Sequence, residues 1–157
     1  MNNSINNSFL KFGLAACLFS FSAFSFSSPS IEGADQDMSA GTVTAKMAHA
    51  DENGWMVVHR TDESMKPGPV IGYAPLKIGQ NDNVNAILME PVESGDMLML
   101  MVHGEKGGMK TGVFEYSLGA KEDGPVKVDG KLVMDIVRAK QDEHIFKNCL
   151  SSSQYLA

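Results

Sequence analysis

The segment MLMLMVHG, residues 97–104, gathers side chains that bind soft metal ions. Successive side chains of an extended strand point to opposite sides, so every second residue shares a face. Neighbours on one face lie about 6–7 Å apart, which flexible methionines can bridge by leaning together. Thioether sulfur suits Cu(I), and imidazole also suits copper. One face therefore presents a candidate set of copper ligands: Met97, Met99, Met101 and His103.

A second histidine ends a similar apolar segment, WMVVH, and is His59. If the two segments are neighbouring strands that run in the same direction, or lie in facing sheets, the imidazoles of His59 and His103 meet at one end of the domain. A shared site would add Met101 or Glu105, with Met97 and Met99 as further candidates. A separation of the imidazole nitrogens above about 8 Å would exclude it, because metal–nitrogen bonds are near 2.0 Å. Apart from each other, the histidines would simply bond locally at strand ends.

The same methionines also fit a structural role, and this is the interpretation that the sequence favours. Methionine fills irregular space in protein cores. Cys149 follows the last predicted strand, so no Met-His-Cys set with blue-copper spacing exists. We therefore expect no cofactor, and keep copper as the alternative.

Other chemical motifs are absent. The segment GEKGGMKT, residues 104–111, lacks the glycine that precedes Lys-Thr in a phosphate-binding loop, and it leads to a predicted strand. DENG and QNDN lack the spacing of a calcium loop. The chain has no Gly-x-Ser-x-Gly, His-Glu-x-x-His or Cys-x-x-Cys motif. We expect no enzymatic activity, and a hydrolase with an unrecognised site is the weakest alternative.

The first 25 residues have the pattern of a secretory signal peptide. A lone cation, Lys11, precedes an apolar run over residues 12–26, and no acidic residue comes before Glu32. The run is shorter than the roughly 20 residues that span a bilayer. Small residues Ala23 and Ser25 predict cleavage after Ser25, and hence a periplasmic or extracellular protein. Lipidation at Cys17 in LAAC is a less favoured alternative, since a polar tether does not follow it.

The charge and cysteine content restrict the partners. The formal net charge is −6, which disfavours nucleic acids and anionic membranes. Loss of the leader leaves Cys149 alone, so no disulfide can form within the mature chain. The remaining partners are a protein, a glycan or a metal ion.

The elements that must position these residues are predicted to be strands. A period-2 pattern covers residues 41–49, and residues 55–60 are apolar on both faces, as in a central strand. Proline lacks an amide proton, so Pro67, Pro69 and Pro75 suggest an edge position for a strand at residues 70–73. GQNDN, residues 79–83, is predicted as a turn. Further strands are expected at residues 84–90, 97–103, 113–118 and 131–139.

These seven strands predict an all-β, antiparallel, immunoglobulin-like sandwich, with a small barrel as the alternative. The predicted organisation is a signal peptide at 1–25, a polar lead-in at 26–40, the β-sandwich domain at 41–139 and a tail at 140–157. The tail is expected to form a short helix around Gln141 to Leu150, with a frayed end.

The order of several motifs resembles a secreted domain family of unknown function, found in surface proteins of halophilic archaea and in bacteria. The matching positions span about residues 36–138 and include Gly54, Trp55, His59, residues 67–72, Gly79, Val84, Met101, His103, Gly112, Phe114 and Glu115. The resemblance implies a β-sandwich module without an established reaction. It also implies that His59, Met101 and His103 are the site candidates, whereas Met97 and Met99 depart from the family pattern. The chain is thus expected to be an exported, non-enzymatic binding or structural module.

Overall fold

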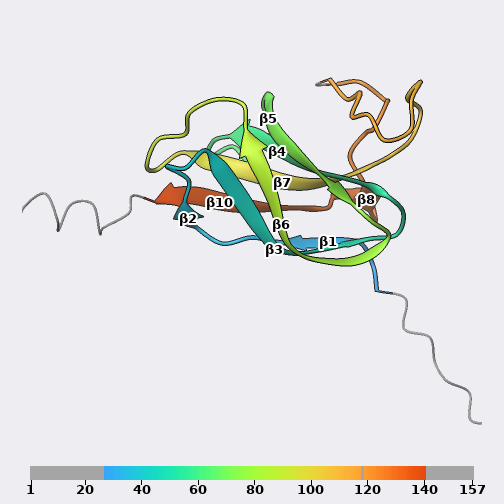
Figure 1. Cartoon of the computed structure of the whole chain (residues 1–157), viewed down its shortest axis with the longest axis horizontal. Coiled ribbons are helices and arrows are strands. Elements are labelled where there is room, and N and C mark those ends of the chain that lie inside the picture. Colours follow the sequence, from blue (N-terminus) through green and yellow to red (C-terminus); the bar gives the residue numbers. More distant parts are fainter. Residues whose placement is uncertain (1–26, 118, 141–157) are drawn as a thin grey trace, which may run out of the picture.

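The structure, a computed structural model of the chain, describes residues 27–117 and 119–140. Within these ranges it is all-β, without a helix, as expected for a β-sandwich (Figure 1). The predicted leader and the predicted tail helix lie outside the described residues. The strands are β1 (Ser30–Glu32), β2 (Gln36–Asp37), β3 (Thr42–Ala50), β4 (Gly54–Thr61), β5 (Val70–Leu76), β6 (Gly79–Leu88), β7 (Met97–Gly104), β8 (Lys127–Val128), β9 (Lys131–Leu132) and β10 (Met134–Lys140).

Eight strands form one curled sheet in the order β1-β3-β6-β5-β4-β7-β10-β2, and β8 and β9 form a separate hairpin. The β10–β2 pair is parallel and the other pairs are antiparallel, so the sheet is mixed. The part of the chain that the structure describes contains no helix that could cross a membrane. The segment between β7 and β8, orange in Figure 1, arches away from the end of the sheet.

The segment from β1 to β2 closes the curled sheet. β1 pairs with β3 near one edge, and β2 pairs with β10 at the other edge. Between them, the amide of Gly33 donates to Asp135 Oδ2 at 2.8 Å. The side chain of Gln36 then reaches Thr44, accepting from its amide and donating to its carbonyl at 2.8 Å each. The predicted lead-in, residues 26–40, thus supplies two strands that join the two edges.

The core lies inside the curl. On β4 and β7 it takes every second residue, since side chains alternate along a strand. The core members from these strands are Met56, Val58, Leu98, Leu100 and Val102. The other face of β4, β7 and β10, directed away from this core, is called the outer face below. As predicted from its apolar character on both sides, β4 is central, between β5 and β7.

Two sequence predictions about neighbouring strands are wrong. The strand that contains Pro75 is not at an edge, because β5 lies between β6 and β4. The missing amide proton is tolerated because β6 pairs with β5 only at Gly72 and Tyr73, so Pro75 lies beyond the end of that ladder. GQNDN is not a turn but the first half of β6, which pairs with β3 from Gly79 onward.

Residues 113–118 do not form the predicted strand. The described part of this segment, residues 113–117, has no ladder partner. Its aromatic side chains have instead docked onto the outer face, where Phe114 lies 5.6 Å from Trp55 between ring centroids. Residues 113–117 therefore form a cap over the outer face, and the aromatic side chains of Phe114 and Tyr116 both point toward that face.

Candidate metal centre

The structure brings the two strand-end histidines together. Their Nε2 atoms are 3.5 Å apart, well inside the limit for a shared ion, and the side chains are 0% and 1% exposed. The route differs from the predicted one, because β4 and β7 are neighbours that run antiparallel. In this ladder Trp55 is opposite His103 and His59 is opposite Met99. Both rings lie on the outer face and reach toward each other along the strands.

Each ring is oriented by a main-chain oxygen. His59 Nδ1 lies 2.8 Å from the carbonyl oxygen of Gly68, and His103 Nδ1 lies 2.6 Å from that of Asp123. A carbonyl oxygen only accepts hydrogen bonds, so both Nδ1 atoms must carry the proton. In neutral rings both Nε2 atoms are then unprotonated, and two lone pairs face each other. This is the tautomer that metal-binding histidines adopt when the other ring nitrogen is held by a carbonyl group.

Burial keeps both imidazoles neutral. It lowers the pKa of His59, against the hydrogen bond to Gly68, which raises it. Burial also lowers the pKa of His103, the bond to Asp123 raises it and the neighbouring His59 lowers it, and together they bring this pKa to about 4. At neutral pH the pair therefore offers two lone pairs without a proton between them.

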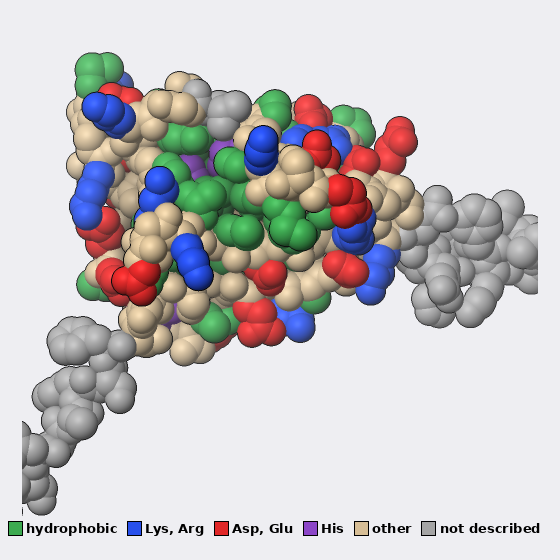
Figure 2. Space-filling view, turned by 180° about the vertical axis from the view of Figure 1, so that it is seen from behind, with side chains coloured by type: hydrophobic (Ala, Val, Ile, Leu, Met, Phe, Trp, Pro, Cys, Tyr) green, Lys and Arg blue, Asp and Glu red, His purple; other side chains and the backbone are tan. Residues whose placement is uncertain are grey.

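An aromatic cap covers the pair. The ring of Tyr116 lies edge-on to that of His103 at 4.6 Å and to that of His59 at 6.0 Å between centroids. Phe114 contacts Tyr73 at 4.5 Å, which ties the cap to β5. Figure 2 shows the outer face, with hydrophobic side chains gathered in its middle, histidine surface among them, and charged groups around the edge.

Asp123 connects the cap to the histidines. Its carbonyl oxygen holds His103, and its carboxylate Oδ2 accepts the amide of Glu115 at 2.8 Å, between the two cap aromatics. The side chain is fully buried, and its Oδ1 has no hydrogen-bond partner among the described atoms. A buried carboxylate with one free oxygen is costly, so its position depends on the surrounding bonds.

The methionines of β7 are buried on the outer face and do not belong to the core cluster. Met101 is opposite Val57, between the ladder positions of His103 and His59, and Met99 is opposite His59. Met97 is farther along, opposite Thr61 on one side and Arg138 on the other. Met101 and Met99 are therefore the thioethers beside the histidine pair, and Met97 is more distant.

Within the described residues, no three side chains of His, Cys, Asp or Glu are placed to hold one metal ion. Glu105, a candidate ligand from sequence, instead accepts the amide of Gly112 at 3.2 Å. An ion at the histidine pair would need its third protein ligand from another residue type. The nearby candidates by register are thioethers, which select soft ions.

Sequence reasoning missed three residues around the site. Gly68 and Asp123 act through main-chain oxygens, which their residue types do not reveal, although Gly68 lies in the matching segment 67–72. Tyr116 was noticed only as a strand residue. Tyr116 is two residues from Phe114, so both side chains of an extended segment point the same way, but the sequence does not show that they cover the histidine pair.

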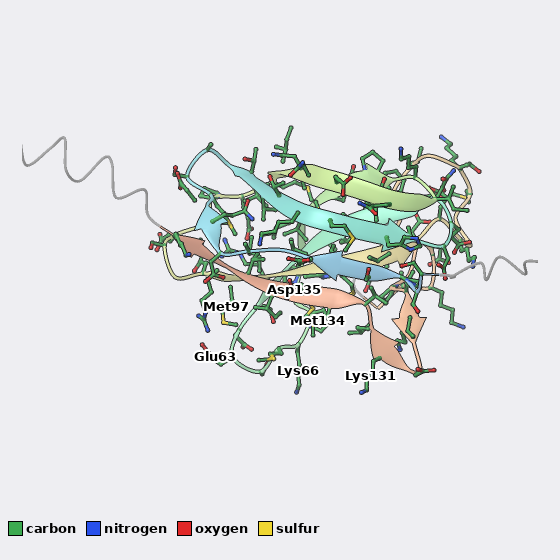
Figure 3. The ribbon with its side chains drawn as sticks, turned by 90° about the horizontal axis from the view of Figure 1, so that it is seen from below. Glu63, Lys66, Met97, Lys131, Met134 and Asp135 are labelled. Carbon is green, nitrogen blue, oxygen red and sulfur yellow. The ribbon has the colours of Figure 1, made fainter. Side chains whose placement is uncertain are left out.

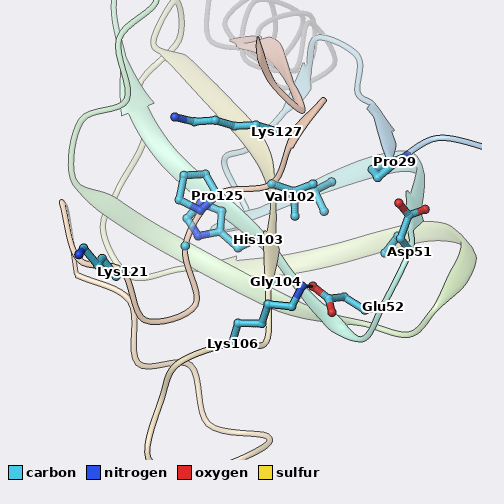
Figure 4. A pocket seen from close by; sticks show the side chains of 13 residues that line it. Pro29, Asp51, Glu52, Val102, His103, Gly104, Lys106, Lys121, Pro125 and Lys127 are labelled. Atoms are coloured by element: carbon cyan, nitrogen blue, oxygen red, sulfur yellow. Dashed lines mark ion pairs between the residues drawn. The ribbon is translucent and has the colours of Figure 1, made fainter. Parts of the chain in front are cut away.

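A separate open cleft of about 470 Å³ lies at the end of the sheet (Figure 4). Lys106, Lys121 and Lys127 border it, and Lys106 is paired with Glu52 at 2.7 Å. Its lining includes His103 but not His59, so it does not contain the space between the two Nε2 atoms.

The model of a domain of unknown function, DUF7282, matches residues 29–156. This range includes every described strand and both histidines, and it confirms the expected relation to an uncharacterised domain family. No curated protein and no solved structure matches the chain. The match assigns no ligand, so the chemistry of the site rests on its geometry.

Proposed function

The chain belongs to the DUF7282 family, whose function is unknown, and we propose that it is an exported, non-enzymatic module that binds one copper(I) ion between His59 and His103. The observation that carries this proposal is the pair of unprotonated Nε2 atoms, 3.5 Å apart and each fixed by a carbonyl bond at Nδ1. Without an ion or a proton, this arrangement places two buried lone pairs against each other. An ion between them removes that repulsion.

The distance suits a three-coordinate ion. For metal–nitrogen bonds of about 2.0–2.1 Å, nitrogens 3.5 Å apart subtend an angle of about 120° at the metal. This is the trigonal angle, and it leaves one position for a further ligand. Met101 lies between the two histidines in the ladder, so its thioether is the best-placed third ligand.

The surroundings favour a soft, singly charged ion. The site offers two neutral imidazoles and thioethers, which suit Cu(I), whereas zinc sites usually add cysteine or a carboxylate. Both histidines are fully buried, and the cost of burying a charge rises steeply with its magnitude. A divalent ion without an anionic ligand would be strongly disfavoured there.

A proton shared between the two Nε2 atoms is the competing explanation, since it would also satisfy every nitrogen. The lowered pKa values of both rings argue against it at neutral pH. If the two nitrogens did share a proton, the histidine pair would be structural and would bind no metal.

A Cu(I) competition titration of residues 26–157, the chain without its predicted leader, tests the proposal. We expect 1:1 binding in the wild type, loss of tight binding in His59→Ala/His103→Ala, and weakening by about 10–100-fold in Met97→Leu/Met99→Leu/Met101→Leu. His49→Ala is the matched control, because His49 lies on β3 and pairs with Gln80, outside the site. Equal binding by the wild type and the double histidine variant would refute the histidine site.

A further inference from the structure

A fourth methionine completes a group of thioethers on the outer face. Met134 on β10 is directly opposite Met101 on β7, and Met99 is its diagonal neighbour, because Ile136 is opposite Met99. Alternation from the core residue Val137 places Met134 on the outer face. Directly opposite Cβ atoms lie about 4.5–5.5 Å apart and diagonal ones about 7–8 Å. Flexible side chains can close these gaps to the sulfur separations that one soft ion needs.

The group is graded in exposure. Met99 and Met101 are 0% and 1% exposed, whereas Met134 is only partly buried. Figure 3 shows Met134 and Met97 directed to the same side of β10, away from the core. Met134 is thus the most exposed of these three methionines, and its ladder partner Met101 lies beside the histidine pair.

The charges around the face favour Met134 over Met97 as the point of entry. Met97 is opposite Arg138, whose guanidinium group pairs with Glu63 at 2.8 Å. A cation that approaches Met97 would therefore come close to the positive guanidinium group of Arg138, which repels it. Met134 is instead opposite Met101, which carries no charge.

We propose that Met134, Met101 and Met99 form a thioether site, adjoining the histidine pair and sharing Met101 with it, that receives a soft monovalent ion from solvent and passes it to the histidine pair. This inference rests on the proposed function for the destination of the ion, but the thioether site itself does not. Transfer is a ligand exchange: the metal–sulfur bonds to Met134 and Met99 break as metal–nitrogen bonds to His59 and His103 form, and Met101 stays bound throughout. The oxidation state does not change, and no proton leaves, because both Nε2 atoms are already unprotonated.

Ag(I), a redox-inert analogue of Cu(I), is the probe, and residues 26–157 are used throughout. Four proteins are compared: the wild type, Met134→Leu, His59→Ala/His103→Ala, and the triple variant that combines these changes. Met89→Leu is the control, because Met89 is 61% exposed and lies outside this group. Leucine keeps most of the packing volume and removes the sulfur.

We expect the double histidine variant to retain one weaker Ag(I) site, which the triple variant loses. We expect Met134→Leu alone to load severalfold more slowly than the wild type in stopped-flow measurements of Trp55 fluorescence. Equal Ag(I) binding by the double and triple variants, or an unchanged loading rate in Met134→Leu, would overturn the inference. Suppose that the wild type and the double histidine variant bind Ag(I) equally, and that Met134→Leu abolishes Ag(I) binding in each of these two backgrounds. The thioether site is then supported and the histidine site is refuted.

Discussion

His103 donates its Nδ1 proton to the main-chain oxygen of Asp123, and the carboxylate of the same aspartate accepts the amide of Glu115. Asp123 thus holds the imidazole through its main-chain oxygen and the aromatic cap through its side chain. The orientation of the ring and the closure of the cap are coupled through this residue.

Replacement of Asp123 should weaken both the orientation of the His103 ring and the attachment of the aromatic cap. We expect Asp123→Ala to lower the free energy of unfolding by about 0.5–1.5 kcal/mol, because the partly buried amide of Glu115 loses its acceptor. Asp123→Asn keeps an accepting oxygen and suits the positive φ of 45° at this position, so its effect should be smaller. Urea denaturation followed by Trp55 fluorescence measures both. A larger loss in the asparagine variant would contradict this role for the carboxylate oxygen.

The metal-free protein should lose stability in mild acid. The folded-state pKa of His103, about 4, lies below its unfolded value of about 6.5, so the unfolded state binds more protons between these limits. Stability is therefore full above about pH 6.5 and falls as the pH drops toward 4, by up to about 3 kcal/mol from this residue. Urea unfolding in the presence of a chelator, at several pH values, gives this curve.

The matched variant for the acid effect is His59→Ala/His103→Ala. Its unfolding free energy should depend much less on pH between 4 and 6.5, since the groups with the depressed pKa are gone. Parallel curves for the two proteins would assign the acid sensitivity to other groups.

Gly68 should tolerate no side chain. A Cβ atom there would lie 2.8 Å from the carbonyl oxygen of Arg60, so the backbone that presents the Gly68 carbonyl to His59 would have to move. We expect Gly68→Ala to weaken Cu(I) binding by about 10-fold, as loss of an orienting bond to a ligand does. Lys66→Ala, in the same exposed loop, is the control. Unchanged affinity in Gly68→Ala, with the fold intact, would show that the Gly68 bond does not orient the ligand.

Tyr116 should control access to the pair. Tyr116→Ala removes the ring that lies 4.6 Å from that of His103 and admits water, so the pKa of His103 should rise toward 6.5. Bound Cu(I) should then dissociate faster to a competing chelator. Tyr116→Phe keeps the ring and should behave as the wild type. NMR titration of the imidazole protons and chelator-capture kinetics measure the two effects, and identical release rates in both variants would argue against a capping role.

Much of the fold followed from local patterns. Alternation found β3, and short apolar runs found β4, β7 and β10, because both patterns depend only on consecutive residues that contribute to the core. The position of β5 was missed because proline excludes a hydrogen bond on one side only, and the sequence does not say where the neighbouring ladder ends. β1 and β2 are too short for a periodic pattern and depend on distant partners.

The sequence singled out the two histidines but not the geometry that brings them together. His59 and His103 stood out because each closes an apolar segment. Their approach depends on the β4–β7 register, in which a two-residue shift would move the rings apart along the ladder. Met134 looked like an ordinary strand residue until its pairing with Met101 was known.

The closure of the sheet by residues 30–37 also bears on the order of folding. Gly33 and Asp135 are 102 positions apart, so the bond that joins the two edges unites the start of the domain with its last strand. Contacts between such distant segments form slowly, because a long loop must close first. While the chain is being made, β1 and β3 to β7 can pair as they emerge, but β2 must wait for β10. Until then one edge of the sheet stays uncovered, and such exposed apolar surface favours aggregation of the incomplete chain.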